Sequence, residues 1–177
     1  MTYAVGTGDL DGSLGGRLGR LWAPHRLAYV TTDDGSGDGC PLCHIPTLSD
    51  VDGMVVARGS SVYAVLNKHP YNPGHLMVLP YRHIAELEDL TQEEAGELMS
   101  FTRAAVVAIK ATSSPQGFNV GLNLGGVAGG SLAAHLHQHV VPRWGGDANF
   151  ITVLGGTKVI PQVLAETRDL LAEAWQK

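Results

Sequence analysis

Three histidines alternate with other residues inside one apolar segment of the chain. His135, His137 and His139 are separated by single residues, and most of the surrounding residues are leucine, alanine or valine. Successive side chains of a strand point to opposite faces, so this spacing puts all three imidazoles on one face, with neighbours about 6.6 Å apart. We therefore predict a buried strand over residues 134–141 that carries a row of imidazoles. Neutral imidazole can act as a nucleophile, transfer a proton or bind a metal near neutral pH.

The length and composition fit a single domain. The chain has 177 residues, of which 44% are hydrophobic, enough for one sizeable core and too few for two large ones. Residues 1–16 contain five glycines and little periodic hydrophobicity, so we expect an arm that orders only against a partner subunit. The domain itself is expected to span residues 17–177.

The charge pattern argues against nucleic-acid and membrane partners. The formal net charge is −5, and the basic residues are dispersed along the chain. No run of about 18 apolar residues is present, and Asp9 and Asp11 lie among glycines where a signal peptide would be basic and then apolar. We therefore expect a cytoplasmic protein, in which a local pocket holds any polyanionic ligand.

Hydrophobic periodicity predicts two main helices. Thr91 and Glu94 have the spacing of a capping box, and apolar residues then recur at helical spacing up to the Ser-Ser-Pro stop at residues 113–115. A C-terminal helix is expected after Pro161. Its apolar side is predicted to carry Val163, Leu164, Leu170 and Leu171.

The remaining periodic segments predict a mainly antiparallel sheet. We expect a short helical segment over residues 18–30, a glycine-rich loop over 125–130, and strands over 63–66, 75–79, 117–123 and 134–141. Strands gathered around one long helix and a C-terminal helix indicate an α+β domain.

The histidine segment and an upstream segment together resemble the histidine triad family. Residues 63–80 contain Asn67 and a Pro-Gly-His element ending at His75, and the order and spacing of these motifs match the family as far as Trp144. Gln138 departs from the pattern, where the family usually has an apolar residue, but strand alternation turns it away from the histidines. The resemblance implies an α+β domain of this family and a homodimer or homotetramer.

The resemblance also implies a role for each histidine. His137, the middle one, would be the nucleophile that attacks the α-phosphorus and forms a nucleotidyl-histidine intermediate. His139 would serve the bridging or leaving oxygen, and His135 would orient the row or bind a metal. His75 would support the catalytic face through a hydrogen bond.

The glycine-rich loop is a candidate phosphate site. Its backbone N–H groups can converge on phosphate oxygens, with Asn123 and Ser131 adding side-chain donors. Ser131 stands where many triad hydrolases have a glutamine, and together with Asn123, Gly130 and residues 142–150 it resembles the diadenosine tetraphosphate phosphorylases of the family. In these, orthophosphate replaces water as the acceptor, and the products are ATP and ADP.

The same resemblance implies the remaining substrate contacts. Asn67 matches the asparagine that contacts the ribose, and neighbouring apolar strand residues such as Leu66 would hold adenine. A divalent ion, Mg²⁺ or Mn²⁺, would accompany the polyphosphate. From its own sequence context, Asn67 is equally explained as a turn residue.

The two cysteines form a candidate metal site. Cys40 and Cys43 have the Cys-x-x-Cys spacing, which in a reducing compartment indicates metal or redox chemistry. The pair resembles the zinc half-site of the cysteine-bearing branch of the superfamily, where His83 and His135 would be the other ligands. Two cysteines and two histidines make a closed structural zinc site. His83 is equally explained as a solvated histidine beside Arg82.

Three alternatives to a phosphorylase remain at this stage. Water could resolve the intermediate, giving a hydrolase of dinucleoside polyphosphates or nucleoside phosphoramidates. A uridylyltransferase would have glutamine where this chain has His139. The chain could also be a zinc-containing nucleotide-binding regulator without catalytic activity.

Overall fold

A five-stranded antiparallel sheet organises the fold. The computed structural model describes residues 39–129, 132–147 and 163–175, so the expectations for residues 1–16, 18–30 and Pro161 lie outside the described residues. The strand order is β1-β2-β3-β5-β4, and each neighbouring pair is antiparallel. The strands are β1 (Val55–Arg58), β2 (Val62–Leu66), β3 (Leu76–Pro80), β4 (Gly117–Leu122) and β5 (Gln138–Arg143). The predicted α+β architecture is confirmed.

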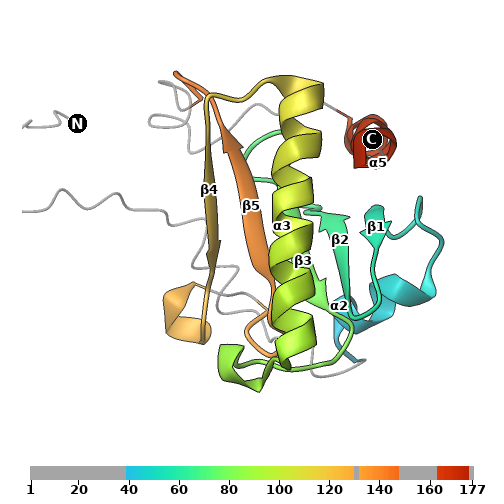
Figure 1. Cartoon of the computed structure of the whole chain (residues 1–177), viewed down its shortest axis with the longest axis vertical. Coiled ribbons are helices and arrows are strands. Elements are labelled where there is room, and N and C mark those ends of the chain that lie inside the picture. The colour runs from blue at the N-terminus through green and yellow to red at the C-terminus, as the bar shows by residue number, and fades with distance from the viewer. Residues whose placement is uncertain (1–38, 130–131, 148–162, 176–177) are drawn as a thin grey trace, which may run out of the picture.

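The long helix α3 (Gln92–Ser113) covers one face of the sheet (Figure 1). Its predicted capping box is present: the Thr91 hydroxyl accepts a hydrogen bond from the Glu94 backbone N–H, and the Glu94 carboxylate accepts one from the Thr91 N–H. Ser114 ends the helix in the left-handed conformation, with a φ of 47°. The core on this face contains Leu66, Leu76, Val78, Leu98, Ala105, Ile109 and Val140.

The opposite face of the sheet holds a smaller core. Leu42, from the short helix α2 (Pro41–His44), packs there against Tyr63, Met77 and Leu79. The Tyr63 hydroxyl donates a 2.6 Å hydrogen bond to the Leu42 carbonyl oxygen. This bond fixes the segment between the two cysteines to strand β2.

The histidine segment differs from its prediction. Strand β5 begins at Gln138, so His135 and His137 precede it and only His139 lies in the strand. The ladders on both sides of β5 start at Gln138, which pairs with Val78 of β3 and Leu122 of β4. The residues before Gln138 lie outside the sheet, and the Leu136 N–H donates to the Ile84 carbonyl oxygen instead. The prediction of one imidazole row on a strand face is therefore wrong.

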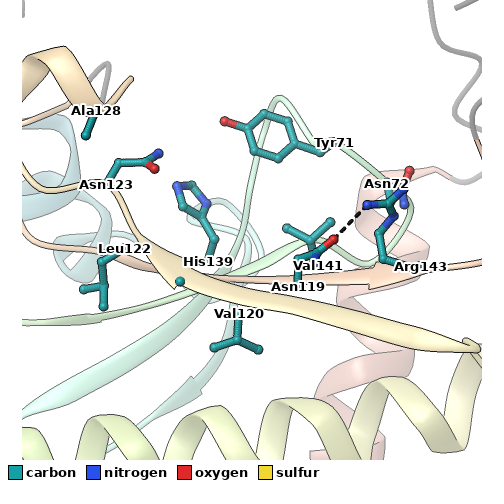
Figure 2. A pocket seen from close by; sticks show the side chains of 11 residues that line it. Tyr71, Asn72, Asn119, Val120, Leu122, Asn123, Ala128, His139, Val141 and Arg143 are labelled. Atoms are coloured by element: carbon teal, nitrogen blue, oxygen red, sulfur yellow. Dashed lines mark hydrogen bonds between the residues drawn. The ribbon is translucent and has the colours of Figure 1, made fainter. Parts of the chain in front are cut away.

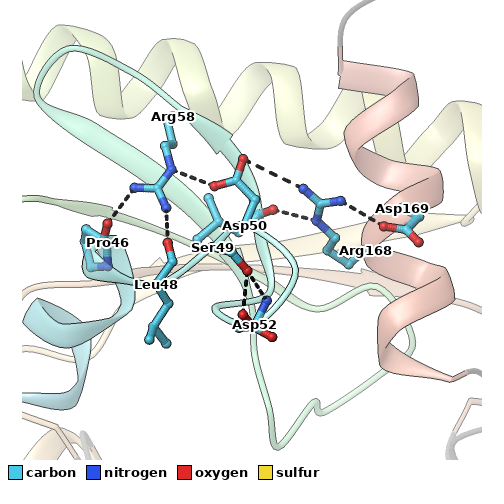
Figure 3. Close-up of polar contacts among 9 residues, drawn as sticks. Pro46, Leu48, Ser49, Asp50, Asp52, Arg58, Arg168 and Asp169 are labelled. Atoms are coloured by element: carbon cyan, nitrogen blue, oxygen red, sulfur yellow. Dashed lines mark hydrogen bonds and ion pairs between the residues drawn. The ribbon is translucent and has the colours of Figure 1, made fainter.

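The C-terminal helix buries Leu171, as predicted, but not the whole of its predicted apolar side. Helix α5 (Leu164–Trp175) buries Thr167 and Leu171, whereas Val163 and Leu170 are exposed. Arg168 connects this helix to β1 and to the loop before it: it donates to the Val55 carbonyl oxygen and pairs with Asp50 (Figure 3). The predicted glycine-rich loop also contains a 3₁₀ turn, η3 (Gly126–Ala128).

Arg58 completes the contacts between α5 and the loop before β1. Its guanidinium donates to the Asp50 carboxylate and to the carbonyl oxygens of Pro46 and Leu48. Figure 3 shows Asp50 between Arg58 and Arg168.

Among the described residues, no helix is both long and apolar enough to cross a bilayer.

The turn after β1 should tolerate no side chain at Gly59. A Cβ there would lie 2.5 Å from Glu97 Oε1 and 2.8 Å from Phe101 Cζ. The Glu97 carboxylate cannot retreat easily, since it accepts hydrogen bonds from the backbone N–H groups of Ser60, Ser61 and Val62. Gly59→Ala should lower the free energy of unfolding by roughly 1–3 kcal/mol in urea titrations. Gly96→Ala, in α3, is the control, because a Cβ there meets nothing within 4 Å beyond the backbone of its own helix and should not destabilise the fold.

The Arg82–Glu94 ion pair should give the fold a specific acid sensitivity. Hydrogen bonding from Arg82 lowers the pKa of Glu94 to about 2, against the opposing effect of burial. The folded-state pKa thus lies below the unfolded value of about 4.3, so this pair stabilises the fold above that pH and loses its effect as pH falls toward 2. Glu94→Gln should lower the melting temperature at pH 7, and the difference from the unsubstituted protein should shrink between pH 5 and pH 2. A difference that stays constant over this range would contradict the prediction.

Candidate functional site

Three of the predicted histidines meet at the start of strand β5. The ring centroids of His137 and His139 are 5.0 Å apart, as are those of His139 and His75. His75 lies just before β3, and His139 pairs with Met77 across the β3–β5 ladder. The sheet thus brings His75, 64 residues earlier in the chain, against His139.

The hydrogen bond at His137 Nδ1 fixes which nitrogen can react. Nδ1 lies 2.7 Å from the backbone carbonyl oxygen of His135. A carbonyl oxygen only accepts hydrogen bonds, so Nδ1 must carry the proton and Nε2 the lone pair. The neutral form of His137 therefore has its lone pair on Nε2, where it can act as a nucleophile.

His75 fixes the orientation of His139 in a similar way. Its Nδ1 accepts the Tyr71 backbone N–H at 3.1 Å, so the proton of the neutral ring is on Nε2, which lies 2.9 Å from His139 Nδ1. Burial, with added repulsion from His139 and His137, lowers the pKa of His75 to about 3. His75 thus stays neutral and donates to His139 Nδ1, which leaves the proton of neutral His139 on Nε2.

A second cluster brings together the four predicted metal ligands. One ligand atom from each of Cys40, Cys43, His83 and His135 lies within 4.8 Å of the others. His135 Nδ1 is 3.4 Å from both sulfurs, and His83 Nδ1 is 3.3 Å from Cys43 Sγ. Bond lengths of about 2.3 Å to sulfur and 2.0 Å to nitrogen give a tetrahedron with N···S edges of roughly 3.5 Å. The donor set and its spacing therefore fit a tetrahedral metal ion.

His135 belongs to both clusters. Its Nε2 donates to the Pro80 carbonyl oxygen at 3.0 Å, which leaves the Nδ1 lone pair directed at the cysteines. Burial lowers the pKa of His135 and so favours the neutral, metal-binding form. Its backbone carbonyl meanwhile holds His137 Nδ1. One residue thus connects the cluster of candidate metal ligands to His137.

The face beyond His139 opens into a pocket of about 470 Å³ (Figure 2). Asn123 and Ala128 lie near His139 at one end, and Asn72 and Arg143 lie at the other. Asn123 is thus near His139, and its role as a phosphate contact stays a prediction. The other two predicted loop contacts, Gly130 and Ser131, lie outside the described residues.

Leu66 does not contact this face. Its side chain is 2% exposed and packs in the core beneath α3, on the opposite side of the sheet from His139. The expectation that Leu66 holds adenine is therefore wrong for this structure. Asn67 accepts the His69 backbone N–H at 2.9 Å, which is the turn geometry that its sequence context predicted.

Several residues of the site were not identified from the sequence. Tyr71 stacks near His75 and His139, with ring centroids 4.7 and 5.8 Å away, and Tyr63 braces the cysteine segment. The Pro80 carbonyl that orients His135 is a backbone group, which no side-chain pattern reveals. Only the position of Tyr71, between Asn67 and the Pro-Gly-His element, offered a usable signal.

Comparisons with known proteins identify the family and relatives of this chain. Residues 49–146 match the HIT domain model. A Mycobacterium tuberculosis protein named AP-4-A phosphorylase is 60% identical over 168 residues, which cover 91% of this chain and 86% of that protein.

Two solved structures share the fold at 25% identity. A hypothetical histidine triad nucleotide-binding protein of Sulfolobus tokodaii aligns with a TM-score of 0.63, covering 77% of this chain and 92% of its own. A zinc-bound histidine triad family protein of Mycobacterium smegmatis aligns with a TM-score of 0.62, covering 78% and 94%. The domain match, which includes more than half of the sequence, shows that this chain belongs to the HIT, or histidine triad, family.

Proposed function

We propose that this protein is a nucleotidyltransferase that phosphorolyses diadenosine 5′,5‴-P1,P4-tetraphosphate to ATP and ADP. The observation that carries the proposal is the tautomer of His137, whose Nε2 lone pair lies beside the paired imidazoles of His139 and His75. The name of the M. tuberculosis relative, AP-4-A phosphorylase, supports the substrate and the acceptor.

In the first half-reaction, His137 Nε2 attacks the α-phosphorus in line. The N–P bond forms as the bond to the bridging oxygen breaks, and ATP leaves with that electron pair. His139, held by His75, presents its Nε2–H to the bridging oxygen and stabilises the developing negative charge. The enzyme keeps an adenylyl group on His137.

In the second half-reaction, orthophosphate takes the place of ATP. Its oxygen attacks the same phosphorus, the N–P bond breaks, and ADP leaves while the His137 lone pair is restored. Asn123, Gly130 and Ser131 are proposed to bind the phosphate oxygens, and Asn67 the ribose. Mg²⁺ or Mn²⁺ would accompany the polyphosphate as part of the substrate.

We also propose that the Cys40, Cys43, His83 and His135 cluster binds structural zinc. The N···S distances of 3.3–3.4 Å and the soft, closed donor set support zinc, as does the zinc-bound M. smegmatis relative. Zinc in this cluster would clamp the cysteine segment to His135. We further propose a homodimer or homotetramer, as the family resemblance implies.

Product analysis separates this proposal from its alternatives. With diadenosine tetraphosphate and Mg²⁺, the protein should turn over repeatedly to ATP and ADP only when orthophosphate is present; without orthophosphate, release should stop at one ATP per active site. ATP and AMP without orthophosphate would identify a hydrolase instead. Binding without turnover would identify a nucleotide-binding regulator.

His137→Ala should reduce turnover by at least about 10³-fold, because the covalent route is lost. His69→Ala is a suitable control, since His69 is an exposed histidine of the β2–β3 turn. Retention of most of the activity by His137→Ala would exclude His137 as the nucleophile.

The purified protein should contain about one zinc per chain, by mass spectrometry of the metal. Cys43→Ser or His83→Ala should lose the zinc and lower the melting temperature. Activity should then fall mainly through kcat, because His135 loses one of its restraints and orients His137 less well. His44→Ala, in the same short helix but outside the cluster, should retain zinc. Full zinc content in His83→Ala would contradict the ligand assignment.

A further inference from the structure

The pocket beyond His139 extends along strands β4 and β5 and ends at a prearranged arginine. On this face β5 presents His139, Val141 and Arg143, and the β4 residues opposite them are Gly121, Asn119 and Gly117. Figure 2 shows the side chains of Val120 and Leu122 pointing the other way, toward α3. Gly121 lines the pocket without a side chain to fill it, and a Cβ there would meet nothing within 4 Å. His139 and Arg143 are four strand residues apart, roughly 13 Å.

Arg143 is held in one orientation by hydrogen bonds that leave some of its N–H groups available to a ligand. Its Nε and Nη2 donate to the Asp147 carboxylate at 2.6 and 2.9 Å, and its Nη1 donates to Asn119 Oδ1 at 2.7 Å. These bonds use three of the five N–H groups of a guanidinium. The side chain of Arg143 is 47% exposed and that of Asp147 only 9%. The positive partner of the pair therefore faces the pocket, and its negative partner is covered.

Asp147 is itself anchored on the protein side. Its carboxylate accepts from Asn72 Nδ2 at 2.7 Å and from the Trp144 backbone N–H at 3.3 Å, and Asn72 also donates to the Pro142 carbonyl oxygen. Asn72 is 1% exposed. The arginine is thus fixed by a buried network, which reduces the entropy lost when it binds a ligand.

The position of the pocket relative to His137 and His139 fits the leaving group of the proposed reaction. In-line attack by His137 Nε2 puts the leaving oxygen on the far side of the phosphorus from His137. The pocket is lined by His139, which serves that oxygen, and His137 is not among its lining residues. A substrate bound for this attack would therefore have the part beyond the scissile bond in this pocket, toward Arg143.

We propose that this pocket binds the leaving nucleoside polyphosphate, with Arg143 contacting its distal phosphate. This inference rests on the proposed function. It assigns Arg143 a role in selecting substrates with a polyphosphate chain, since AMP, which ends at the α-phosphate, cannot reach it. A guanidinium with two remaining donors suits bidentate binding of phosphate oxygens.

Equilibrium binding to a His137→Ala protein tests this without turnover. The informative variant is Arg143→Gln with Asp147→Asn, which removes both charges together and leaves no unpaired carboxylate. By calorimetry, it should weaken binding of diadenosine tetraphosphate about tenfold and binding of AMP less than twofold. Arg143→Lys should give an intermediate loss for the dinucleotide, because it keeps the charge and loses the fork. Arg103→Gln, on the exposed side of α3, is the control and should change neither affinity.

Each other outcome has a distinct meaning. Equal loss for both ligands, or no loss for either, would overturn the role of Arg143 while the proposed function stands. If diadenosine tetraphosphate does not bind the His137→Ala protein while AMP does, both this inference and the proposed substrate are wrong. A matching melting temperature for the double variant shows that any loss of affinity is not a loss of fold.

Discussion

The hydrogen bond from His137 Nδ1 to the His135 carbonyl oxygen is the contact on which the chemistry depends. At 2.7 Å it fixes the tautomer of His137 and so places the reactive lone pair on Nε2. The position of this carbonyl oxygen depends on the position of His135. The ring of His135 is held by the Pro80 carbonyl oxygen at Nε2 and by the two cysteines at Nδ1. A metal ion in this cluster would therefore act on catalysis indirectly, by fixing the residue that orients the nucleophile.

The two faces of the sheet have different roles: one packs against α3, and the other carries His139. On one face, Leu66, Val78 and Val140 bury apolar surface against α3, which is the main source of folding free energy. Gln138 belongs to that face, and its Nε2 donates to Thr102 Oγ1 of α3 at 2.6 Å. The next residue, His139, belongs to the other face. A rigid core thus supports the imidazoles from beneath, and loops and polar side chains surround them.

The sequence predicts the elements of this fold better than it predicts the histidine segment. Local signals, such as the Thr91–Glu94 capping box and the short apolar runs of β2 and β3, specify their elements because neighbouring residues determine them. The alternation of the three histidines gave a wrong start for the strand. The start of β5 is decided by its pairing with β3 and β4, which are distant in the sequence. Family resemblance still identified the four residues of the metal cluster, which lie far apart in the chain. The roles of the Pro80 carbonyl and Arg143 depend on tertiary contacts, and the sequence gives no comparable signal for them.

A covalent intermediate on His137 is the central claim, and trapping it is the most direct test. The protein would be mixed with diadenosine tetraphosphate and Mg²⁺ in phosphate-free buffer, denatured at alkaline pH to protect the acid-labile N–P bond, and digested for mass spectrometry. An AMP adduct on His137 that disappears as ADP when orthophosphate is added before denaturation is the predicted result. Turnover with no adduct on His137, or with the adduct on another residue, would contradict the assignment of the nucleophile.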